Sequence, residues 1–237
     1  DSMFRAFKWF VFRILTDRGQ DSLVDDIVIL NNKDVDFVRK KYKKNVFVIP
    51  HASFSYYVKD ECDYTIKNKI GFFGRIEPYK GLDLLIDAFE QQSNKTLKLL
   101  IAGSGYIESN LKTRIESNSN IELINRYIED DEFQILINSI DFVVLPYKRA
   151  SQSGVIPMSF AFGKTVIATR VGALDEQVPC GTGILVEPSL TAISTAITTL
   201  YSNPSEIENM GRAAQYYAQK ELTWTHSADL LLTYINN

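Results

Sequence analysis

The chain has 237 residues, of which 45% are hydrophobic and 23% charged, and its formal net charge is −3. These values are typical of a globular protein of one or two domains, and the charge gives no global indication of nucleic-acid binding. The two cysteines and two histidines match no standard zinc pattern, and no apolar run approaches the roughly 20 residues of a membrane-spanning helix. We therefore expect a metal-free cytoplasmic protein without a secretory signal.

The first 50 residues predict a single β-α-β unit preceded by a helix. The apolar pattern places a helix over residues 3–15, a strand over 27–30, a helix over 32–42 and a strand over 46–49. One such unit is too small for a domain-sized sheet, so we interpret residues 1–50 as the last part of another α/β domain. A polar, irregular stretch follows, and we expect a linker over residues 51–68. Within it, His51 either faces a cleft between domains or is an ordinary hydrogen-bonded histidine.

From residue 69 onward, short continuous apolar strands alternate with helices. The strands are expected at 70–73, 97–102, 121–124, 141–145, 165–168 and 183–186. The helices are expected at 81–91, 106–117, 131–139, 154–162, 173–178 and 189–201, followed by two more within 204–236. Unbroken apolar strands such as LKLLIA and DFVVLP are typical of a parallel sheet covered on both faces. Because crossovers between parallel strands are right-handed, residues 69–237 are predicted to form a doubly wound, Rossmann-like α/β domain.

The turn after the first strand of this domain combines a glycine with two cations. The stretch from Lys69 to Lys80 reads KIGFFGRIEPYK, in which Gly74 ends the strand and Arg75 follows it directly. Ligands of open α/β sheets bind at the carboxyl ends of strands, and cations beside a helix N-terminus suit a phosphate group. The pattern alone is equally compatible with an ordinary turn that carries two solvated charges. The neighbouring turns favour the first interpretation.

Three later turns belong on the same edge of the sheet. The GxG turn at Gly103 and Gly105 is a weak signal, because a tight turn also needs glycine for structural reasons. Another turn spans residues 125–130. The last, PYKRASQSG, brings Ser153 and Gly154 to a helix start, where unpaired N–H groups favour an anion and serine is also a common N-cap. Two cations and a helix N-terminus on one edge together indicate a phosphate-bearing ligand.

The order and spacing of these motifs resemble a known family. The matching segments are GRIEPYKGLDLLIDAFE, LLIAGSG, DFVVLPY, SGVIPMSFAFGKTVIATRVGALDEQV and GTGILVEP. They resemble the C-terminal domain of the family-4 retaining glycosyltransferases of the GT-B fold, over about residues 25–237. The resemblance implies that residues 69–237 bind a nucleotide-sugar donor and that residues 1–50 are a remnant of the acceptor-binding N-terminal domain. Such a chain is expected to bind the donor without transferring sugar on its own.

The resemblance also implies roles for the residues that would meet the donor phosphates. Arg75 and Lys80 match the cations that hold the donor diphosphate, and we expect them to assist catalysis. Ser153, Gly154 and Val155 match the helix start that meets the same phosphates. Fixed cations and N–H groups there stabilise the negative charge of the departing diphosphate more in the transition state than in the ground state.

Further positions follow from the same resemblance. Tyr127 and Ile128 match the loop beside the nucleotide base. Glu176 matches a glutamate near the cleft, although a solvated helix carboxylate is an equally good interpretation. In full, the positions expected to bind the donor besides the two cations are Gly74, Gly103, Gly105, Tyr127, Ile128, Ser151, Ser153, Gly154, Val155, Ser159 and Glu176.

One departure from the family pattern concerns two glutamates. The family's E-x7-E signature would place them at positions 151 and 159, where this chain has Ser151 and Ser159. In the family the second glutamate accepts hydrogen bonds from the ribose, and the first lies near the donor sugar. A serine cannot replace the charge-assisted bonds of a carboxylate. If Ser159 lies at the ribose end of the pocket, Ser159→Glu should be tolerated and should tighten nucleotide binding.

We therefore interpret the chain as part of a retaining glycosyltransferase that uses a nucleotide-diphosphate sugar and neither a metal ion nor another cofactor. The expected acceptor is a saccharide or a lipid-linked molecule, as in bacterial surface-polysaccharide biosynthesis. Two alternatives stay open: a non-catalytic module that binds a nucleotide sugar, which the two serines would permit, and a GT-B nucleotide-sugar epimerase. Residues 33–44 carry six basic against two acidic side chains, which suggests either peripheral contact with an anionic membrane or a solvated helix face.

Overall fold

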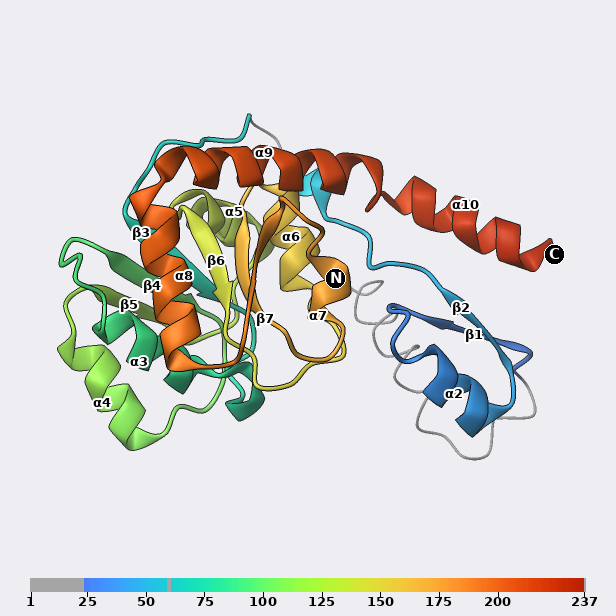
Figure 1. Ribbon diagram of the computed structural model, residues 1–237, viewed down its shortest axis with the longest axis horizontal. Coiled ribbons are helices and arrows are strands. Elements are labelled where there is room, and N and C mark those ends of the chain that lie inside the picture. The colour runs from blue at the N-terminus through green and yellow to red at the C-terminus, as the bar shows by residue number, and fades with distance from the viewer. Residues whose placement is uncertain (1–23, 59–60, 237) are drawn as a thin grey trace. The chain divides into compact units, whose positions relative to one another are not determined.

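The computed structural model describes residues 24–58 and 61–236, and the chain divides into two compact units, Asp1–Ile49 and Pro50–Asn237 (Figure 1). The helix predicted over residues 3–15 lies outside the described residues. Within the first unit, the parallel strands β1 (Asp26–Ile29) and β2 (Asn45–Val48) are connected by α2 (Val35–Tyr42). The predicted β-α-β unit is therefore confirmed.

Helix α2 begins three residues later than the apolar pattern predicted. The reason is a local polar turn, in which the Asp34 backbone N–H donates to Asn31 Oδ1 and Asn31 Nδ2 donates to Asp34 Oδ2, both at 2.9 Å. Such side-chain bonds compete with the first helical turn for the backbone groups. The inner side of the unit is a small apolar cluster centred on Ile27, Val38 and Val46.

The second unit is built on a six-stranded parallel sheet. Its strands are β3 (Lys69–Phe73), β4 (Lys98–Ala102), β5 (Ile121–Ile124), β6 (Phe142–Leu145), β7 (Val166–Thr169) and β8 (Gly183–Val186). Their order across the sheet is β5-β4-β3-β6-β7-β8, so the chain adds strands outward from β3 and then continues on the other side of β3. This order confirms the predicted doubly wound sheet, and β3 and β6 mark the point where the strand order reverses.

Helices pack on both faces of this sheet (Figure 1). They are α3 (Leu82–Glu90), α4 (Ser109–Ser117), α5 (Asp130–Asn138), α6 (Val155–Ala161), α7 (Leu174–Gln177), α8 (Leu190–Ser202) and α9 (Pro204–Lys220). A last helix, α10 (Trp224–Ile235), has no buried residue and extends away from the sheet (Figure 1). Two short 3₁₀ helices, η1 (Ser55–Tyr57) and η2 (Pro78–Lys80), precede β3 and α3. None of the helices in the described part of the chain has the length and hydrophobicity needed to cross a bilayer.

The central strands carry two sets of buried side chains, because successive residues of a strand point to opposite faces. In β3, Phe72 joins the apolar cluster that includes α3 and α8, whereas Phe73 joins the cluster that includes α5 and α6. The same alternation divides Phe142 and Val144 from Val143 on β6. Burial on both faces explains why these strands are unbroken apolar runs in the sequence.

Candidate functional site

The turn predicted to bind phosphate begins at the end of β3. Gly74 leaves the strand with a φ of +106°, a conformation that favours glycine. A Cβ atom at Gly74 would lie 3.4 Å from Lys80 Nζ and 3.6 Å from Val155 Cγ2. The turn after β3, the lysine and the start of α6 therefore meet at Gly74. This is the carboxyl end of the β3–β6 switch point, where open α/β sheets bind ligands.

Two neighbouring cations occupy this position. Lys80 is half-buried at the end of η2, and burial lowers the pKa of its ammonium group. The positive charge of Arg75 lowers the pKa further, whereas Tyr79 and the carboxylate of Glu77 oppose the shift. The Arg75 side chain is exposed. Among the described residues, neither cation forms an ion pair with a carboxylate. The strand ends thus carry two adjacent positive charges, of which that of Lys80 is partly offset by the nearby carboxylate of Glu77.

A chain of hydrogen bonds connects Lys80 with the start of α6. Lys80 Nζ donates to the hydroxyl of Tyr147 at 2.7 Å, and that hydroxyl lies 3.2 Å from Ser153 Oγ. Ser153 Oγ in turn accepts the backbone N–H of Val155 at 3.3 Å. Tyr147 follows β6 and is 2% exposed, and burial raises the pKa of its phenol to about 12. Ser153 therefore bonds to the first turn of α6, although the N-cap position is Gly154 and not the predicted Ser153, because the helix begins at Val155.

The loop around Ser153 is also held from α7. The backbone N–H of Ser153 donates to Gln177 Oε1 at 2.7 Å, and Gln177 Nε2 donates to the Ser153 carbonyl at 3.2 Å. A single amide side chain thus fixes the loop by two bonds. Sequence reasoning selected the adjacent Glu176, which lies half-buried on α7, and missed Gln177. The sequence contained no signal for this, since an amide that binds a backbone has no fixed spacing from its partner.

The two glycines of the GxG turn allow it to lie close to the backbone of the turn after β3. A Cβ atom at Gly103 would collide with the carbonyl oxygen of Gly74, and one at Gly105 would collide with the carbonyl oxygen of Ile76. The backbones approach because Ile76 N–H donates to the Ser104 carbonyl at 2.8 Å, beside a bridge between Ile76 and Gly105. The structural interpretation of these two glycines is therefore the better supported one, and α4 begins at Ser109, three residues later than predicted.

His51 also reaches the start of α6. Its Nε2 atom would lie 3.5 Å from a Cβ atom at Gly154, while Nδ1 donates to the Ala52 carbonyl at 2.8 Å. Because a carbonyl only accepts, this bond requires a proton on Nδ1, while Nε2 lies near Gly154. The hydrogen-bonded interpretation of His51 is thus confirmed, and a position facing a cleft between domains stays a prediction.

The remaining predicted residues are more dispersed. Tyr127 is 60% exposed beyond β5, which lies two strands from β3 on the same edge, and Ile128 packs against the core. Ser151 is exposed in the loop before α6. Beside it, Gln152 Oε1 is buried and has no hydrogen-bond partner in the described structure, which is unusual for a buried polar atom.

Ser159 differs from its expectation. Its side chain is 0% exposed, and its hydroxyl donates to the Val155 carbonyl at 2.7 Å within α6. In this conformation it has no surface to offer a ribose. A glutamate there would have to be buried, so the expectation that Ser159→Glu is tolerated is replaced by the opposite one.

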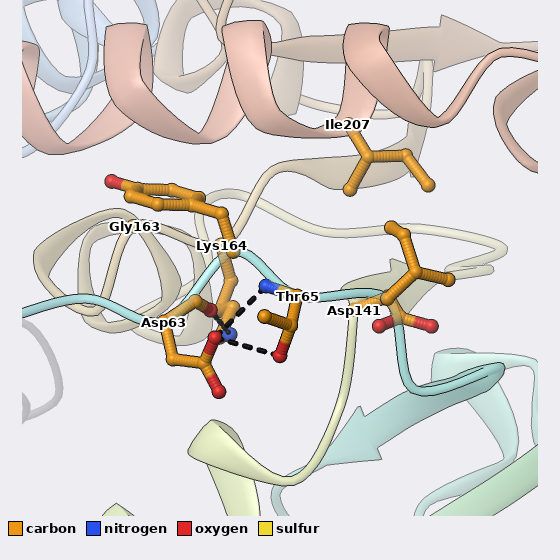
Figure 2. A pocket seen from close by; sticks show the side chains of 8 residues that line it. Asp63, Thr65, Asp141, Gly163, Lys164 and Ile207 are labelled. Atoms are coloured by element: carbon orange, nitrogen blue, oxygen red, sulfur yellow. Dashed lines mark hydrogen bonds between the residues drawn. The ribbon is translucent and has the colours of Figure 1, made fainter.

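A small cavity of about 10 Å³ lies at the other edge of the sheet, at the amino ends of the strands (Figure 2). Asp141 and Lys164, which precede β6 and β7, line it together with Asp63. Figure 2 shows Lys164 Nζ directed at the Asp63 carbonyl, with a bond of 3.1 Å. Burial lowers the pKa of Lys164 to about 8. This space is about one water molecule in size and lies away from the strand ends that bind ligands.

Potential metal ligands do not gather in the described structure: no three His, Cys, Asp or Glu side chains are placed to hold an ion together. Beside the Gly74 turn, Arg75 and Lys80 supply positive charge.

Comparison with known proteins identifies the family to which this chain belongs. The family described as glycosyl transferases group 1 matches residues 67–203, which is more than half of the chain. The chain belongs to this family. Its fold is the one expected for the C-terminal domain of a GT-B glycosyltransferase, with the reversal point of the sheet at the matched residues.

Two of the similar curated proteins are named as glycosyltransferases. The chain is 26% identical over 134 residues to a GDP-mannose:glycolipid 4-beta-D-mannosyltransferase of Xanthomonas campestris pv. campestris, covering 54% of this chain and 38% of the relative. It is 31% identical over 171 residues to a D-inositol 3-phosphate glycosyltransferase of Pseudarthrobacter chlorophenolicus, covering 68% and 40%. The chain thus spans about two fifths of the length of these relatives.

Solved structures share the fold at low identity. HepE of Anabaena, solved in complex with UDP and glucose, has a TM-score of 0.77 at 17% identity, covering 92% of this chain and 65% of that one. A sucrose-phosphate synthase of Thermosynechococcus elongatus has a TM-score of 0.76 at 18% identity, covering 92% and 60%.

Proposed function

We propose that this chain is the donor-binding part of a glycosyltransferase that takes a sugar, with retention, from a nucleotide-diphosphate sugar. The observation that carries the proposal is the adjacent pair of Arg75 and Lys80 at the β3–β6 switch point, where neither cation forms an ion pair among the described residues. A diphosphate is the group whose charge and shape fit two adjacent cations at strand ends. The transferase relatives support this reading, since one is named for GDP-mannose and HepE was solved with UDP.

The proposed chemistry breaks the bond between the anomeric carbon of the sugar and the diphosphate oxygen. The electron pair of that bond stays on the leaving diphosphate, while the acceptor hydroxyl forms the new bond and loses its proton. The guanidinium of Arg75 binds two phosphate oxygens, and the ammonium of Lys80 adds a point charge. Both act more strongly on the departing diphosphate than on the intact donor, which lowers the barrier.

Retention and metal independence are further parts of this proposal. Attack from the face that the diphosphate leaves, with the phosphate itself accepting the proton of the acceptor, would retain configuration without a protein nucleophile. Two side chains supply the positive charge at the leaving group, so we expect transfer to continue in the presence of a chelator. The acceptor is proposed to be a saccharide or a lipid-linked molecule of a bacterial surface polysaccharide, and the Xanthomonas relative is named for a glycolipid.

A non-catalytic nucleotide-sugar module is the second candidate, because serines occupy positions 151 and 159. The deciding experiment has two steps. Thermal unfolding of this chain with UDP, GDP, ADP and their nucleosides identifies the nucleotide, since a ligand of the folded state raises the melting temperature. The full-length protein is then assayed with that nucleotide's sugars for transfer, epimerisation and donor hydrolysis, and NMR of the product gives the anomeric configuration.

The two steps separate the candidates. Stabilisation by one nucleoside diphosphate together with transfer in the full-length protein supports the proposal. Stabilisation without any turnover supports the module, and epimerisation supports the nucleotide-sugar epimerase. No stabilisation by any nucleotide contradicts all three. For the 237-residue chain alone, we expect binding without transfer.

We also propose peripheral contact between α2 and an anionic membrane. Lys40 and Lys41 are exposed on this helix, and Phe37 between the basic positions is 62% exposed. Lys41 Nζ lies 5.6 Å from the centre of the Phe37 ring, so apolar and basic groups share one surface. Each basic residue near an anionic surface contributes about 1 kcal/mol, screened by salt. Sedimentation with anionic but not neutral vesicles at low salt is expected, and equal sedimentation with both would exclude the contact.

A further inference from the structure

We propose that Tyr147 is a positioning residue of the donor site: its hydroxyl holds the Lys80 ammonium in place and couples it to the loop at Ser153. This inference rests on the proposed function, because Lys80 is taken as a diphosphate ligand. Tyr147 follows β6 and Lys80 follows β3, so the bond joins the two strands that flank the switch point.

The direction of each hydrogen bond follows from its chemistry. An ammonium group only donates, so the phenol oxygen must accept the 2.7 Å bond from Lys80 Nζ. The phenol proton is then directed to Ser153 Oγ at 3.2 Å, because a phenol is a better donor than an aliphatic hydroxyl. Ser153 Oγ also accepts the Val155 N–H at 3.3 Å. The charge of Lys80 is thus connected to the first turn of α6 by oriented bonds.

The surroundings of the phenol make this arrangement rigid. Tyr147 is 2% exposed and belongs to the apolar cluster around β6 and α6. The Lys80 ammonium lies 4.5 Å from the centre of the Tyr147 ring, within reach of a cation–π interaction. A Cβ atom at Gly74 would also lie 3.4 Å from this ammonium, so Lys80 is held next to the turn that follows β3.

Tyr147→Phe tests the role of the hydroxyl, because it keeps the ring and its packing. Tyr201→Phe is the matched control: it also removes one phenol hydroxyl, which bonds to Asp141 Oδ2 at 2.8 Å, at the opposite edge of the sheet. We expect Tyr147→Phe to weaken binding of the stabilising nucleoside diphosphate, UDP or GDP, by about three- to tenfold. Binding of uridine or guanosine should not change, and Tyr201→Phe should leave both affinities unaltered.

The pH dependence provides a signature that a general loss of packing would not produce. A hydrogen bond to the charged form raises the pKa of an amine, so its removal lowers the pKa of Lys80. The charged or titratable groups facing this ammonium are Tyr79, Arg75, Glu77 and Tyr147. In Tyr147→Phe, the loss of diphosphate affinity at alkaline pH should therefore begin at a lower pH than in the unaltered protein.

A second measurement needs no ligand. The ammonium of Lys80 is observed by ¹⁵N NMR in the free chain, with Lys80→Arg used to assign its signal, and titrated with pH. A lower pKa in Tyr147→Phe but not in Tyr201→Phe supports the proposal even if no nucleotide binds, in which case the proposed function fails by itself. An unchanged Lys80 pKa, or equal losses of nucleoside and diphosphate affinity, would overturn the positioning role.

Discussion

The amino ends of the strands (the amino edge of the sheet) and their carboxyl ends (the carboxyl edge) each carry a lysine next to a glycine. The surroundings of these two lysines differ. At the amino edge, Lys164 is 2% exposed and donates to the Asp63 carbonyl, with Asp141 close by. At the carboxyl edge, Lys80 is half-buried beside a second cation, and its ammonium donates to the neutral Tyr147 hydroxyl. Burial lowers the pKa of both lysines; Cys62, Asp141 and Asp63 oppose the shift at Lys164, and Tyr79 and Glu77 oppose it at Lys80.

We interpret the charged groups at the amino edge as structural, and Arg75 and Lys80 at the carboxyl edge as functional. Asp141 accepts the backbone N–H of Lys67 at 2.7 Å, that of Lys69 at 2.9 Å and the Tyr201 hydroxyl at 2.8 Å, so it fastens the linker to the strand ends. Polar groups satisfied in this way contribute to stability. Arg75 and Lys80 repel each other and form no ion pair among the described residues, although Glu77 partly offsets the charge of Lys80; a bound anion would stabilise both cations. Substitutions at the two edges should therefore affect different measurements.

Ser159→Glu should have the largest effect. Helix α6 begins at the carboxyl edge but carries Ser159 inward, where the side chain is 0% exposed. A carboxylate buried there without a cation should lower the free energy of unfolding by about 4 kcal/mol or more. Urea unfolding followed by circular dichroism measures it, and Ser159→Ala, which removes only the bond to the Val155 carbonyl, is the control. A stable Ser159→Glu protein with tighter nucleotide binding would restore the original expectation of a ribose contact.

Asp141→Ala should have the next largest effect, again on stability. It leaves the donors of Lys67, Lys69 and Tyr201 without their acceptor, which should cost about 2–4 kcal/mol of unfolding free energy. The affinity of the folded protein for nucleoside diphosphate should not change. Asp83→Ala is the control, because Asp83 is an exposed partner of Lys148 and its loss should cost less than about 1 kcal/mol. A weaker diphosphate affinity in Asp141→Ala would mean that the two edges are coupled.

These expectations also indicate what the sequence alone could predict. Strand positions and sheet order followed from unbroken apolar runs, because burial on both faces leaves a direct signal along the chain. Gly74, Arg75 and Lys80 were selected because a strand end and a helix start lie close together in the sequence. The Lys80–Tyr147–Ser153 bonds could not be predicted, since they depend on the crossover that brings β3 beside β6. The burial of Ser159 was missed because a polar residue gives no pattern that marks it as internal.

Arg75→Ala should affect binding and leave stability nearly unchanged, because the side chain is exposed. Loss of a guanidinium that holds two phosphate oxygens should weaken nucleoside diphosphate binding by roughly ten- to hundredfold. Lys80→Ala should show the same selectivity with a similar or smaller loss. Calorimetric titration with diphosphate and nucleoside measures both, and Lys112→Ala, a cation paired with Glu116 on α4, is the control. Equal losses for the two ligands, or none for either, would remove Arg75 and Lys80 from the phosphate site.

Lys164→Met should produce the smallest effect, a change in how the free energy of unfolding depends on pH. The pKa of Lys164 is lowered to about 8 in the folded chain from an ordinary value of 10.5, mainly by burial and also by Lys67, while Cys62, Asp141 and Asp63 oppose the shift. Between these two values the unfolded chain binds a proton that the folded chain lacks, so stability rises with pH. From pH 7 to pH 9, we expect the unaltered protein to gain about 1 kcal/mol that Lys164→Met does not gain.

The neighbouring thiol must be removed from this comparison. Burial raises the pKa of the Cys62 thiol in the folded chain. The contribution of Cys62 to the free energy of unfolding therefore falls as pH rises, which is opposite to the contribution of Lys164. Both proteins are therefore compared in a Cys62→Ala background by urea unfolding at pH 7, 8 and 9. The same dependence on pH with and without Lys164 would show that this lysine keeps an ordinary pKa, and the amino edge would then resemble an exposed surface. A difference of the expected sign, with unchanged diphosphate affinity, would assign the charge of Lys164 to stability alone.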